Sequence, residues 1–600
     1  MGNWVHLAAE VASLVRNGFI DLFYTSFSSA PRSVWRVNNW TACISAEESL
    51  LLSSPISADG IKVALWSMKP FKAPGPNGLH AGFFQCSWHT VGANVVKEVQ
   101  NIFCCGVMPS YLNHTLILLI PKCVGADCLS KFRPIGLCNT IYKVITKIII
   151  LRLCPLLDKL ISPLQTAFVP GKKDLDNMII VQELVHSFSL KRGNSGFMAI
   201  KIDLEKAYDR LEWQFIRDML IFFKIPKDLA KLIMSCITTS SISVLLNGGK
   251  LEPFLPSHGI RQGDPLSPYI FIICMEFLSF LILERCGDLL WDPIKASRTG
   301  PSFSHLFFAD DLFLFAKADQ KNCQSVKEVL ECCDLSGQKI SLHKSKAYFS
   351  PNVSSEQRNV LCSILGIAST PNLGKYLGFP IIHLGSSARD FDFVVEKIQS
   401  KLTSWKSNLL SMAGRVILAQ SVTSSMPSYV MQGVLLPSKI LKSIDQINRN
   451  FIWGSIDIRK KLHLVSWKKI TKPKSASGLG LMAAKPKNLV LTAKLCWRFK
   501  SNPHEPWVKV LRSKYMAGPR PRTYALSKTW TTMLKGEIIC NLGSRWLIGS
   551  NCSLNFWYDK WLKLGTMRSL IHGHLNCEEE NLCINNIFEG GFWNFSYSLF

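Results

Sequence analysis

The chain has 600 residues, too many for one hydrophobic core, and its hydrophobic fraction of 48% is ample for folding, so we expect three or four structural units. The formal net charge of +27 favours a polyanionic partner, because cations that neutralise phosphates release counterions. A merely soluble basic surface is the alternative explanation of this charge.

The first 60 residues show weak helical periodicity and no pattern that indicates a chemical function. Residues 71–78 read Phe-Lys-Ala-Pro-Gly-Pro-Asn-Gly, which predicts a loop that turns sharply and exposes backbone amides. An apolar strand is predicted over residues 116–122, and residues 132–135 follow it after a polar loop.

Two apolar stretches, residues 141–157 and 269–283, invite comparison with membrane spans. The first is broken by Lys143, Lys147 and Arg152, and the second is short and contains Glu276. Neither reaches the roughly 20 apolar residues that cross a bilayer, so both are predicted to be buried helices. The N-terminus lacks the pattern of a secretory signal. We therefore expect an intracellular protein, nuclear or cytoplasmic, that is not secreted and has no membrane partner.

Three aspartates are the candidate metal ligands. Asp203 ends a short apolar strand and precedes a helix-like stretch, while Asp310 and Asp311 lie between two apolar runs that predict a strand, a tight turn and a returning strand. The adjacent pair alone is explained equally well by a solvated turn, since Asp favours turns. Carboxylates a few Å apart repel by about 4 kcal/mol at an effective dielectric near 20, so three that converge persist ionised only around a cation.

Magnesium is the cation that such a group favours, because it takes hard oxygen ligands and shares substrate phosphates. Two magnesium ions can activate an attacking hydroxyl and stabilise the leaving oxygen of a phosphoryl transfer. Since neighbouring strand residues point to opposite faces, Asp310 and Asp311 are expected to have unequal roles, with Asp310 the direct ligand.

The 20 cysteines include no Cys-x2-Cys pair, which fits neither a disulfide framework nor a zinc knuckle and indicates a reducing, intracellular compartment. The string His572-Gly-His-Leu-Asn-Cys577 is the one metal-like cluster in the sequence. A surface loop is the preferred interpretation of it.

The C-terminal part begins with helical spacing over residues 391–436 and 437–453. Residues 451–540 then hold 19 Lys or Arg and three acids, interleaved with tryptophans, which is a plausible nucleic-acid surface. In the alternative interpretation, preferred for most of the tryptophans, these rings are core and only the lysines meet water. The tryptophans are Trp453, Trp467, Trp497, Trp507 and Trp530.

Five segments in this order resemble the successive motifs of reverse transcriptases, most closely those of plant non-LTR (LINE-type) retrotransposons. They are Asp203-x4-Tyr208, Gly259-Ile-Arg-Gln-Gly-Asp-Pro-Leu-Ser-Pro268, Phe308-Ala-Asp-Asp311, Ser336-Gly-Gln-Lys-Ile-Ser-Leu-His-Lys-Ser345 and Lys375-Tyr-Leu-Gly-Phe-Pro380. The resemblance spans roughly residues 60 to 455, and the part after it resembles the region that follows in those elements.

The resemblance implies that Asp203, Asp310 and Asp311 hold two magnesium ions, with Asp311 nearer the primer end. Lys344 matches a lysine that protonates or neutralises the departing pyrophosphate. A solvated lysine at a strand end is nearly as good an interpretation of Lys344 from the residues alone.

Four basic residues are candidates for contacts with phosphate, and for Lys122 and Arg133 the family has matching positions. Lys122 and Arg133 would grip the triphosphate of the incoming nucleotide. Lys172 and Lys173 lie in a segment that resembles one near the template. Without the resemblance, Lys122 and Arg133 would be taken as ordinary surface cations.

The remaining matches concern the sugar and the base. Tyr208 corresponds to an aromatic residue beneath the sugar, where a ring leaves no room for a 2′-hydroxyl, although by itself it would be read as a core residue. Gln262 and Gly263 correspond to a pair near the nascent base pair, and Gly263 permits close backbone approach.

Three residues depart from the family pattern. Asn77 takes a position that is usually Asp, which keeps the turn but loses a charge. His258 stands where relatives often have Arg, and Ser341 stands where they commonly have Asn.

The resemblance implies an α+β right-hand polymerase, with fingers, an antiparallel-sheet palm and a helical thumb, followed by a basic, mainly helical C-terminal region. The expected segments are 1–60, an N-terminal extension or linker remnant; 61–370, fingers and palm; 371–455, a thumb-like helical region; and 456–600, a basic Trp-rich region that ends before any zinc-binding or ribonuclease H module.

The expected activity is that of an RNA-directed DNA polymerase, which uses an RNA template, a DNA primer and deoxynucleoside triphosphates in retrotransposition. Two alternatives stay open. One is a decayed retroelement fragment that only binds nucleic acid, and the other is an RNA-dependent RNA polymerase.

Overall fold

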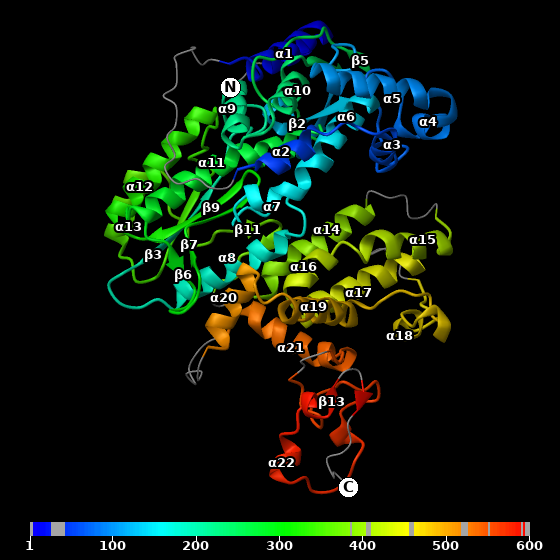
Figure 1. The fold of residues 1–600 in the computed structure, drawn as a ribbon, viewed down its shortest axis with the longest axis vertical. Coiled ribbons are helices and arrows are strands. Elements are labelled where there is room, and N and C mark those ends of the chain that lie inside the picture. Colours follow the sequence, from blue (N-terminus) through cyan, green and yellow to red (C-terminus); the bar gives the residue numbers. More distant parts are fainter. Residues whose placement is uncertain are drawn as a thin grey trace. The chain divides into compact units, whose positions relative to one another are not determined.

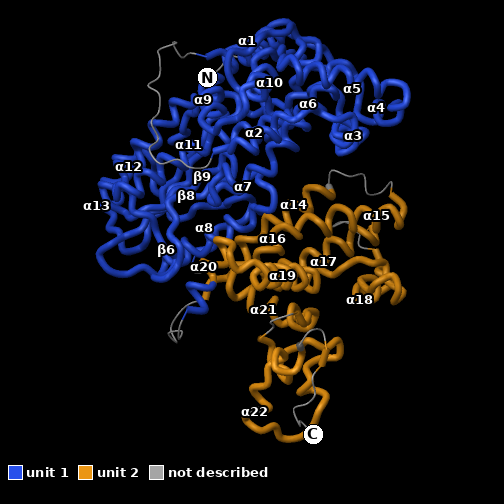
Figure 2. The backbone as a smooth tube through the Cα atoms, viewed as in Figure 1, with its two compact units in different colours: residues 1–384, 512–517 blue, residues 385–511, 518–600 orange. Residues whose placement is uncertain are grey.

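The computed structural model describes residues 4–25, 43–383, 387–403, 410–454, 461–517, 526–549, 553–589 and 592–593. The chain divides into two compact units (Figure 2), of which unit 1 comprises residues 1–384 and 512–517 and unit 2 comprises residues 385–511 and 518–600. Unit 1 mixes helices and sheets, and unit 2 is mainly helical in its described part (Figure 1), so the predicted mixture of helix and sheet is confirmed. The roles of the four predicted segments stay predictions, and residues 26–42 of the first segment lie outside the described residues.

An antiparallel sheet with the strand order β10-β3-β9-β8 lies in unit 1. Its strands are β3 (Phe197–Ile202), β8 (His305–Phe308), β9 (Asp311–Lys317) and β10 (Lys346–Phe349). These strands are apolar almost throughout because both faces of the sheet are covered. On one face, Ile200 and Leu314 share a core with helices α11 (Ser267–Gly287) and α12 (Gln320–Glu331). On the other face, the ring of Phe313 lies 4.8 Å from that of Tyr376.

A second sheet has the strand order β2-β1-β4-β5, in which β1 pairs with β2 antiparallel and with β4 parallel. Its strands are β1 (His114–Pro121), β2 (Phe132–Cys138), β4 (Ser241–Leu246) and β5 (Gly249–Lys250). Helix α1 (Ala8–Leu22) packs Val15 and Phe19 into one apolar cluster with Ile117 and Val244 of this sheet. The N-terminal segment, whose sequence suggested no chemistry, therefore contributes a helix to unit 1.

The two predicted buried helices are confirmed as α6 (Thr140–Leu153) and α11. In contrast, the helix predicted directly after Asp203 was wrong, because residues 205–210 form turns and helix α9 begins only at Trp213. Lys206 has a φ of +49°, a left-handed conformation that interrupts a right-handed helix. None of the helices in the described ranges combines the length and the apolar composition needed to cross a bilayer.

The remaining helices and strands of unit 1 surround these two sheets (Figure 1). They are α2 (Ala46–Ser53), α3 (Ala58–Trp66), α4 (Ala81–Cys86), α5 (Trp88–Cys105), α7 (Leu157–Leu160), α8 (Asp174–Ser189), α9 (Trp213–Phe222), α10 (Lys227–Thr238), α13 (Ser355–Leu365), β6 (Ile294–Lys295), β7 (Ser302–Phe303), β11 (Lys375–Tyr376) and β12 (Phe379–Pro380).

Unit 2 confirms the helical spacing predicted after residue 391. Its elements are α14 (Asp392–Thr403), α15 (Met412–Leu418), α16 (Ser428–Gly433), α17 (Ser438–Trp453), α18 (Trp467–Ile470), α19 (Ala484–Ser501), α20 (Pro506–Tyr515), α21 (Lys528–Gly543), α22 (Cys577–Glu580), β13 (Phe588–Glu589) and β14 (Phe592–Trp593), with α20 grouped in unit 1 from Arg512 onward. The core interpretation of the tryptophans holds for Trp507 and Trp530, which are buried, whereas Trp497 is 52% exposed.

Candidate active site

An open cavity of about 880 Å³ lies in unit 1 and collects most of the predicted site residues. Those that line it are Lys122, Arg133, Asp203, Tyr208, Gln262, Gly263, Asp310 and Lys344. The cavity thus brings together residues from the segment after β1, from β2, from the end of β3, from the β8–β9 turn and from the loop before α11.

The predicted hairpin around the aspartate pair is confirmed. Phe308 of β8 pairs with Asp311 of β9, so Ala309 and Asp310 form a two-residue turn, with a φ of +53° at Ala309. Asp310 at the tip is exposed to the cavity, whereas Asp311 already belongs to the strand and is not among the residues that line the cavity. The two acids therefore occupy unequal positions, as strand alternation predicts.

Asp203 is fixed by the loop that precedes β10. Its N–H donates to Ser345 Oγ at 3.1 Å, and its carbonyl oxygen accepts from the N–H of Ser341 at 2.8 Å. Because this second contact uses backbone, the departure from Asn at position 341 leaves it intact. Lys344 Nζ lies 3.7 Å from Asp203 Oδ2, and both side chains are about half exposed, so this ion pair is weak.

Burial and mutual repulsion shape the acidity of the pair. Burial raises the pKa of Asp310, and the charge of Asp203 raises it further. Burial also raises the pKa of Asp311, with added repulsion from Asp310 and Asp203. A cation at this edge of the cavity would relieve that repulsion.

Within the part of the chain that the structure describes, no group of three or more His, Cys, Asp or Glu is arranged to hold a metal ion by itself. This finding covers the described residues of the His572 to Cys577 string, whose loop interpretation stands. Two of the predicted ligands, Asp203 and Asp310, line the open cavity. That donor set fits Mg²⁺, which keeps waters and takes substrate phosphates as further ligands.

Tyr208 has a fixed ring. It stacks on Phe271 of α11, with ring centroids 4.6 Å apart and planes 11° apart, and burial raises the pKa of its hydroxyl. The phenol is therefore neutral at ordinary pH. One face of the side chain is held by the core while the residue lines the cavity.

The loop that carries Gln262 and Gly263 is pressed against strand β2. The N–H of Gly136 donates to the carbonyl oxygen of Gln262 at 2.6 Å. Gly263 has a φ of +104°, and a Cβ atom there would lie 2.7 Å from the carbonyl oxygen of Gly136. Only glycine satisfies both the conformation and the close approach.

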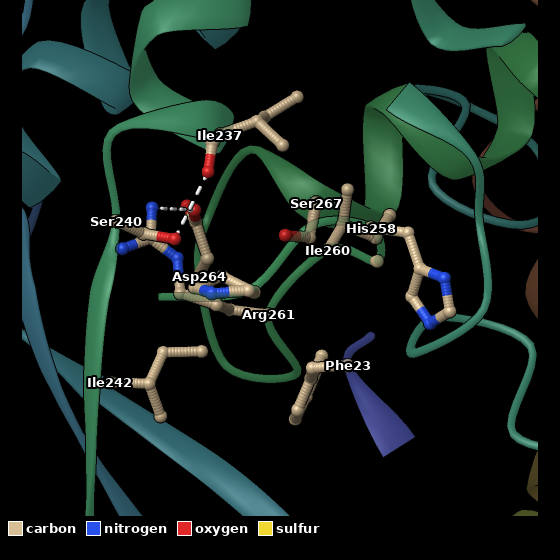
Figure 3. Close-up of a pocket in the computed structure, with 11 residues that line it drawn as sticks. Phe23, Ile237, Ser240, Ile242, His258, Ile260, Arg261, Asp264 and Ser267 are labelled. Carbon is tan, nitrogen blue, oxygen red and sulfur yellow. Dashed lines mark hydrogen bonds and ion pairs between the residues drawn. The ribbon is translucent and has the colours of Figure 1, made fainter. Parts of the chain in front are cut away.

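A buried ion pair anchors the same loop. Arg261 Nη2 lies 3.1 Å from Asp264 Oδ2, both side chains are buried, and Figure 3 shows them facing each other. Arg261 Nη1 also donates to Asn113 Oδ1 at 2.7 Å and to Thr115 Oγ1 at 2.8 Å, and Tyr142 donates its hydroxyl to Asp264 at 2.6 Å. The loop is thereby tied to β1 and α6.

Beside this anchor lies a small cavity of about 10 Å³, the space of roughly one water molecule (Figure 3). Arg261 and Asp264 were missed as positioning residues in the sequence. Their only signal was two opposite charges three residues apart, which gives no hint of burial.

The cationic side of the cavity has more members than were predicted. Lys122 is held by a bond from Nζ to the carbonyl oxygen of Ser130 at 2.9 Å. Lys206 and Arg210 line the cavity as well, and burial together with nearby positive charge lowers the pKa of Lys206. Cations gathered in this way favour a polyanionic ligand.

Helix α1 supplies part of the cavity wall. Its residues Gly18, Phe19 and Leu22 are among those that line it. His258 joins this helix to the site, because Nε2 lies 2.9 Å from the carbonyl oxygen of Leu22 and Nδ1 lies 3.4 Å from Glu212. Sequence reasoning missed this wall, and no local motif marked it.

Lys172 and Lys173 are not among the residues that line the cavity. Lys172 Nζ donates to the carbonyl oxygens of Ser162 at 3.0 Å and Gln165 at 3.3 Å. A phosphate contact by these two lysines stays a prediction. Asn77 keeps its turn, since its Oδ1 accepts from the N–H of Leu79 at 3.1 Å.

Comparison with known proteins gives the context of this cavity. The family described as "Reverse transcriptase (RNA-dependent DNA polymerase)" matches residues 120–381, which carry most of the lining residues. A solved structure of apo telomerase from Candida tropicalis covers 46% of this chain and 56% of its own at 15% identity and a TM-score of 0.30, which is too slight a likeness to support an argument.

Three curated relatives are similar in sequence. A proposed ribonuclease H protein of Arabidopsis thaliana is 32% identical over 36% of this chain. The transposon TX1 149 kDa protein of Xenopus laevis is 26% identical over 67% of it, and the retrovirus-related Pol polyprotein from type-2 retrotransposable element R2DM of Drosophila melanogaster is 28% identical over 45%. The matches cover 36%, 30% and 24% of these proteins, so the chain spans about a third or less of each.

Proposed function

Because residues 120–381 are a reverse transcriptase domain whose relatives are Pol proteins of non-LTR retrotransposons, we propose that this chain is an RNA-directed DNA polymerase. It adds deoxynucleotides to the 3′-hydroxyl of a DNA primer while copying an RNA template in retrotransposition. The single observation that carries the proposal is the cavity, where acids and cations far apart in the sequence meet.

The proposal gives each sheet a place in a right-hand polymerase. The antiparallel sheet β10-β3-β9-β8 carries the aspartates and serves as the palm. Strands β1 and β2 serve as the fingers, with Lys122 directly after β1 and Arg133 in β2. Helices α14 to α17, which lie within residues 371–455, serve as the thumb, which would clasp the duplex.

Asp203 and Asp310 line the cavity, and together with Asp311 they would hold two magnesium ions. When bound there, magnesium supplies Lewis acidity at the attacking and leaving oxygens. The positions of the carboxylates would determine where the magnesium ions bind. Repulsion from the neighbouring aspartates contributes to the raised pKa values of Asp310 and Asp311, and a bound cation would offset that repulsion.

The bond changes are those of nucleotidyl transfer. The primer 3′-oxygen forms a bond to the α-phosphorus, the bond between that phosphorus and the bridging oxygen breaks, and pyrophosphate leaves. Lys122 and Arg133 bind the triphosphate oxygens and orient the chain of phosphates. Lys344, next to Asp203, neutralises or protonates the departing pyrophosphate.

Primer extension on an RNA template with Mg²⁺ tests the proposal. We expect the wild type to extend the primer and Asp310→Asn combined with Asp311→Asn to reduce extension by at least a thousandfold. Asp288→Asn, a change at an exposed aspartate after α11, is the matched control and should extend normally.

Each other outcome decides against part of the proposal. Extension that survives the double substitution would refute the metal assignment. Binding of primer and template without extension by the wild type would favour a decayed fragment, and a preference for ribonucleotides would indicate an RNA polymerase.

A further inference from the structure

Asp209 is a buried carboxylate in the wall of the cavity, with a side chain that is 1% exposed. Its Oδ1 and Oδ2 lie 3.4 and 3.2 Å from Nε2 of Gln262. A buried carboxylate loses its hydration and therefore needs a hydrogen-bond partner inside the protein. The amide of Gln262 is within reach to serve as that partner.

The chemistry of this contact fixes the direction of the amide. An ionised carboxylate only accepts hydrogen bonds, the amide nitrogen only donates, and the amide oxygen only accepts. Nε2 of Gln262 therefore turns toward Asp209, and Oε1 is left as an acceptor beside the cavity.

The backbones on both sides leave little other freedom. The N–H of Asp209 donates to the carbonyl oxygen of Lys206 at 2.9 Å, and a Cβ atom on Gly259 would collide with the carbonyl group of Asp209. The carbonyl oxygen of Gln262 is held by Gly136 at 2.6 Å. With both backbones held, the direction of the amide depends on the side-chain torsions of Gln262 and on its contact with Asp209.

We propose that Asp209 is a positioning residue that holds the amide of Gln262 with its carbonyl oxygen toward the bound nucleotide, so that this point of the site selects a hydrogen-bond donor. A deoxynucleotide offers a donor as the 3′-hydroxyl of its sugar or as an amino group of its base. Phosphate oxygens are only acceptors and are excluded there. This inference rests on the proposed polymerase function.

The direction of the Gln262 amide should depend on pH, because Asp209 itself titrates. Burial raises the pKa of Asp209 to about 7, while Lys206, Lys122 and His258 act in the opposite direction. Below that pH the protonated carboxyl gains a donor that can bond to Oε1, which releases the amide. Selection for a donor should therefore weaken as the pH falls below 7.

Asp209→Asn tests the inference, because the Asn amide can donate to Oε1 and admits the reversed orientation. The measurement is single-nucleotide incorporation, as kcat/KM, with all four deoxynucleotides and with their 3′-deoxy analogues at pH 8. If the sugar hydroxyl is the donor, the wild-type preference for deoxynucleotides over the analogues should shrink about tenfold in the variant. If a base amino group is the donor, the loss should appear for bases that carry one, adenine, cytosine or guanine, and be absent for thymine.

The control is Glu276→Gln, a change at another buried carboxylate of the same unit that does not line this cavity. Its selectivity should equal that of the wild type. Unchanged sugar and base selectivity in Asp209→Asn would overturn the inference while extension itself still supports the proposed function. A wild type that incorporates nothing would overturn both.

A second measurement serves if Asp209→Asn fails to fold. Wild-type selectivity is followed from pH 8 to pH 6 beside Gln262→Met, which keeps the length of the side chain and removes the amide. We expect the wild-type selectivity to fall with pH and that of Gln262→Met to stay low and flat. Parallel profiles would contradict a role for the amide.

Discussion

The expected role of Tyr208 in selecting the sugar depends on the neighbouring ring of Phe271 as well as on its own ring. Phe271 is fully buried in α11, and the stacked pair holds the Tyr208 ring in one place at the edge of the cavity. Periodicity alone would have counted Tyr208 as a core residue. The motif around Asp203 identified it, and the structure supplies the support that makes the ring rigid.

Removing this ring should relax the choice of sugar. We expect Tyr208→Ala to raise ribonucleotide incorporation relative to deoxynucleotide incorporation by tenfold or more, because space opens where a 2′-hydroxyl would lie. Tyr208→Phe keeps the ring and should keep the preference. The ratio of kcat/KM values for the two nucleotide types is the measurement, and an equal loss in both variants would assign the effect to the hydroxyl group instead.

Single residues were predictable where a motif or a strand end marked them. Asp310 could be found because two apolar runs frame it. Arg261 and Asp264 could not, because their burial depends on Asn113, Thr115 and other partners more than 100 positions away. The sequence lists charges, but it does not say which of them the fold removes from water.

At the scale of elements, the loop before α11 should tolerate no side chain at Gly263. Gly263→Ala combines an unfavourable φ with a collision against Gly136, so the loop must move away from β2. We expect primer extension to fall at least a hundredfold. Gly287→Ala at the end of α11, where a Cβ atom would meet nothing within 4 Å, is the control, and a similar loss there would contradict the explanation.

Helix α11 carries a buried acid whose titration should appear in the stability of unit 1. Burial raises the pKa of Glu276 from 4.5 to about 8. The folded state therefore holds this proton more tightly than the unfolded state, so its contribution to stability is full below pH 4.5 and is lost as the pH rises toward 8 and beyond.

Glu276→Gln should remove this dependence. The variant should be more stable than the wild type at pH 9 by an amount on the order of a few kcal/mol, and the two should converge at low pH. Thermal unfolding between pH 5 and pH 9 measures the difference. Parallel curves for the two proteins would show that Glu276 is not the group that titrates.

Elements with a continuous apolar pattern were the easiest to predict, as β1, α6 and α11 show. The stretch after Asp203 was harder, because its residues have helical propensity but the left-handed Lys206 and the bond from Asp209 to it impose turns. Helix α1 gave only weak periodicity, since one narrow face of it packs on the sheet.

At the scale of the molecule, the chain leaves unit 1 at residue 385 and returns to it at residues 512–517. Lys514 Nζ lies 2.9 Å from Glu183 Oε2, and both side chains are fully buried. Tyr515 donates its hydroxyl to the same oxygen at 2.8 Å. Lys514 belongs to the basic stretch interpreted from sequence as a possible nucleic-acid surface, so this lysine is excluded from such a surface.

Removing this lysine should weaken unit 1. We expect Lys514→Met to lower the free energy of unfolding of unit 1 by about 3–5 kcal/mol, because the buried carboxylate of Glu183 loses the cation that pairs with it. Hydrogen exchange in strands β3 and β9 is the measurement. Arg285→Met, which breaks an exposed pair with Glu328 at 3.3 Å, is the control and should cost less than about 1 kcal/mol. Equal effects would contradict the burial argument.

The late return of the chain has a consequence for how the protein is made. A ribosome that has added residue 384 must add about 130 more residues before Lys514 is part of the chain. This takes roughly 7 to 26 s at 5–20 residues per second. During that interval Glu183 cannot form its ion pair with Lys514. A message that stops within the intervening stretch would release a chain whose unit 1 lacks residues 512–517 and therefore lacks the lysine that pairs with Glu183.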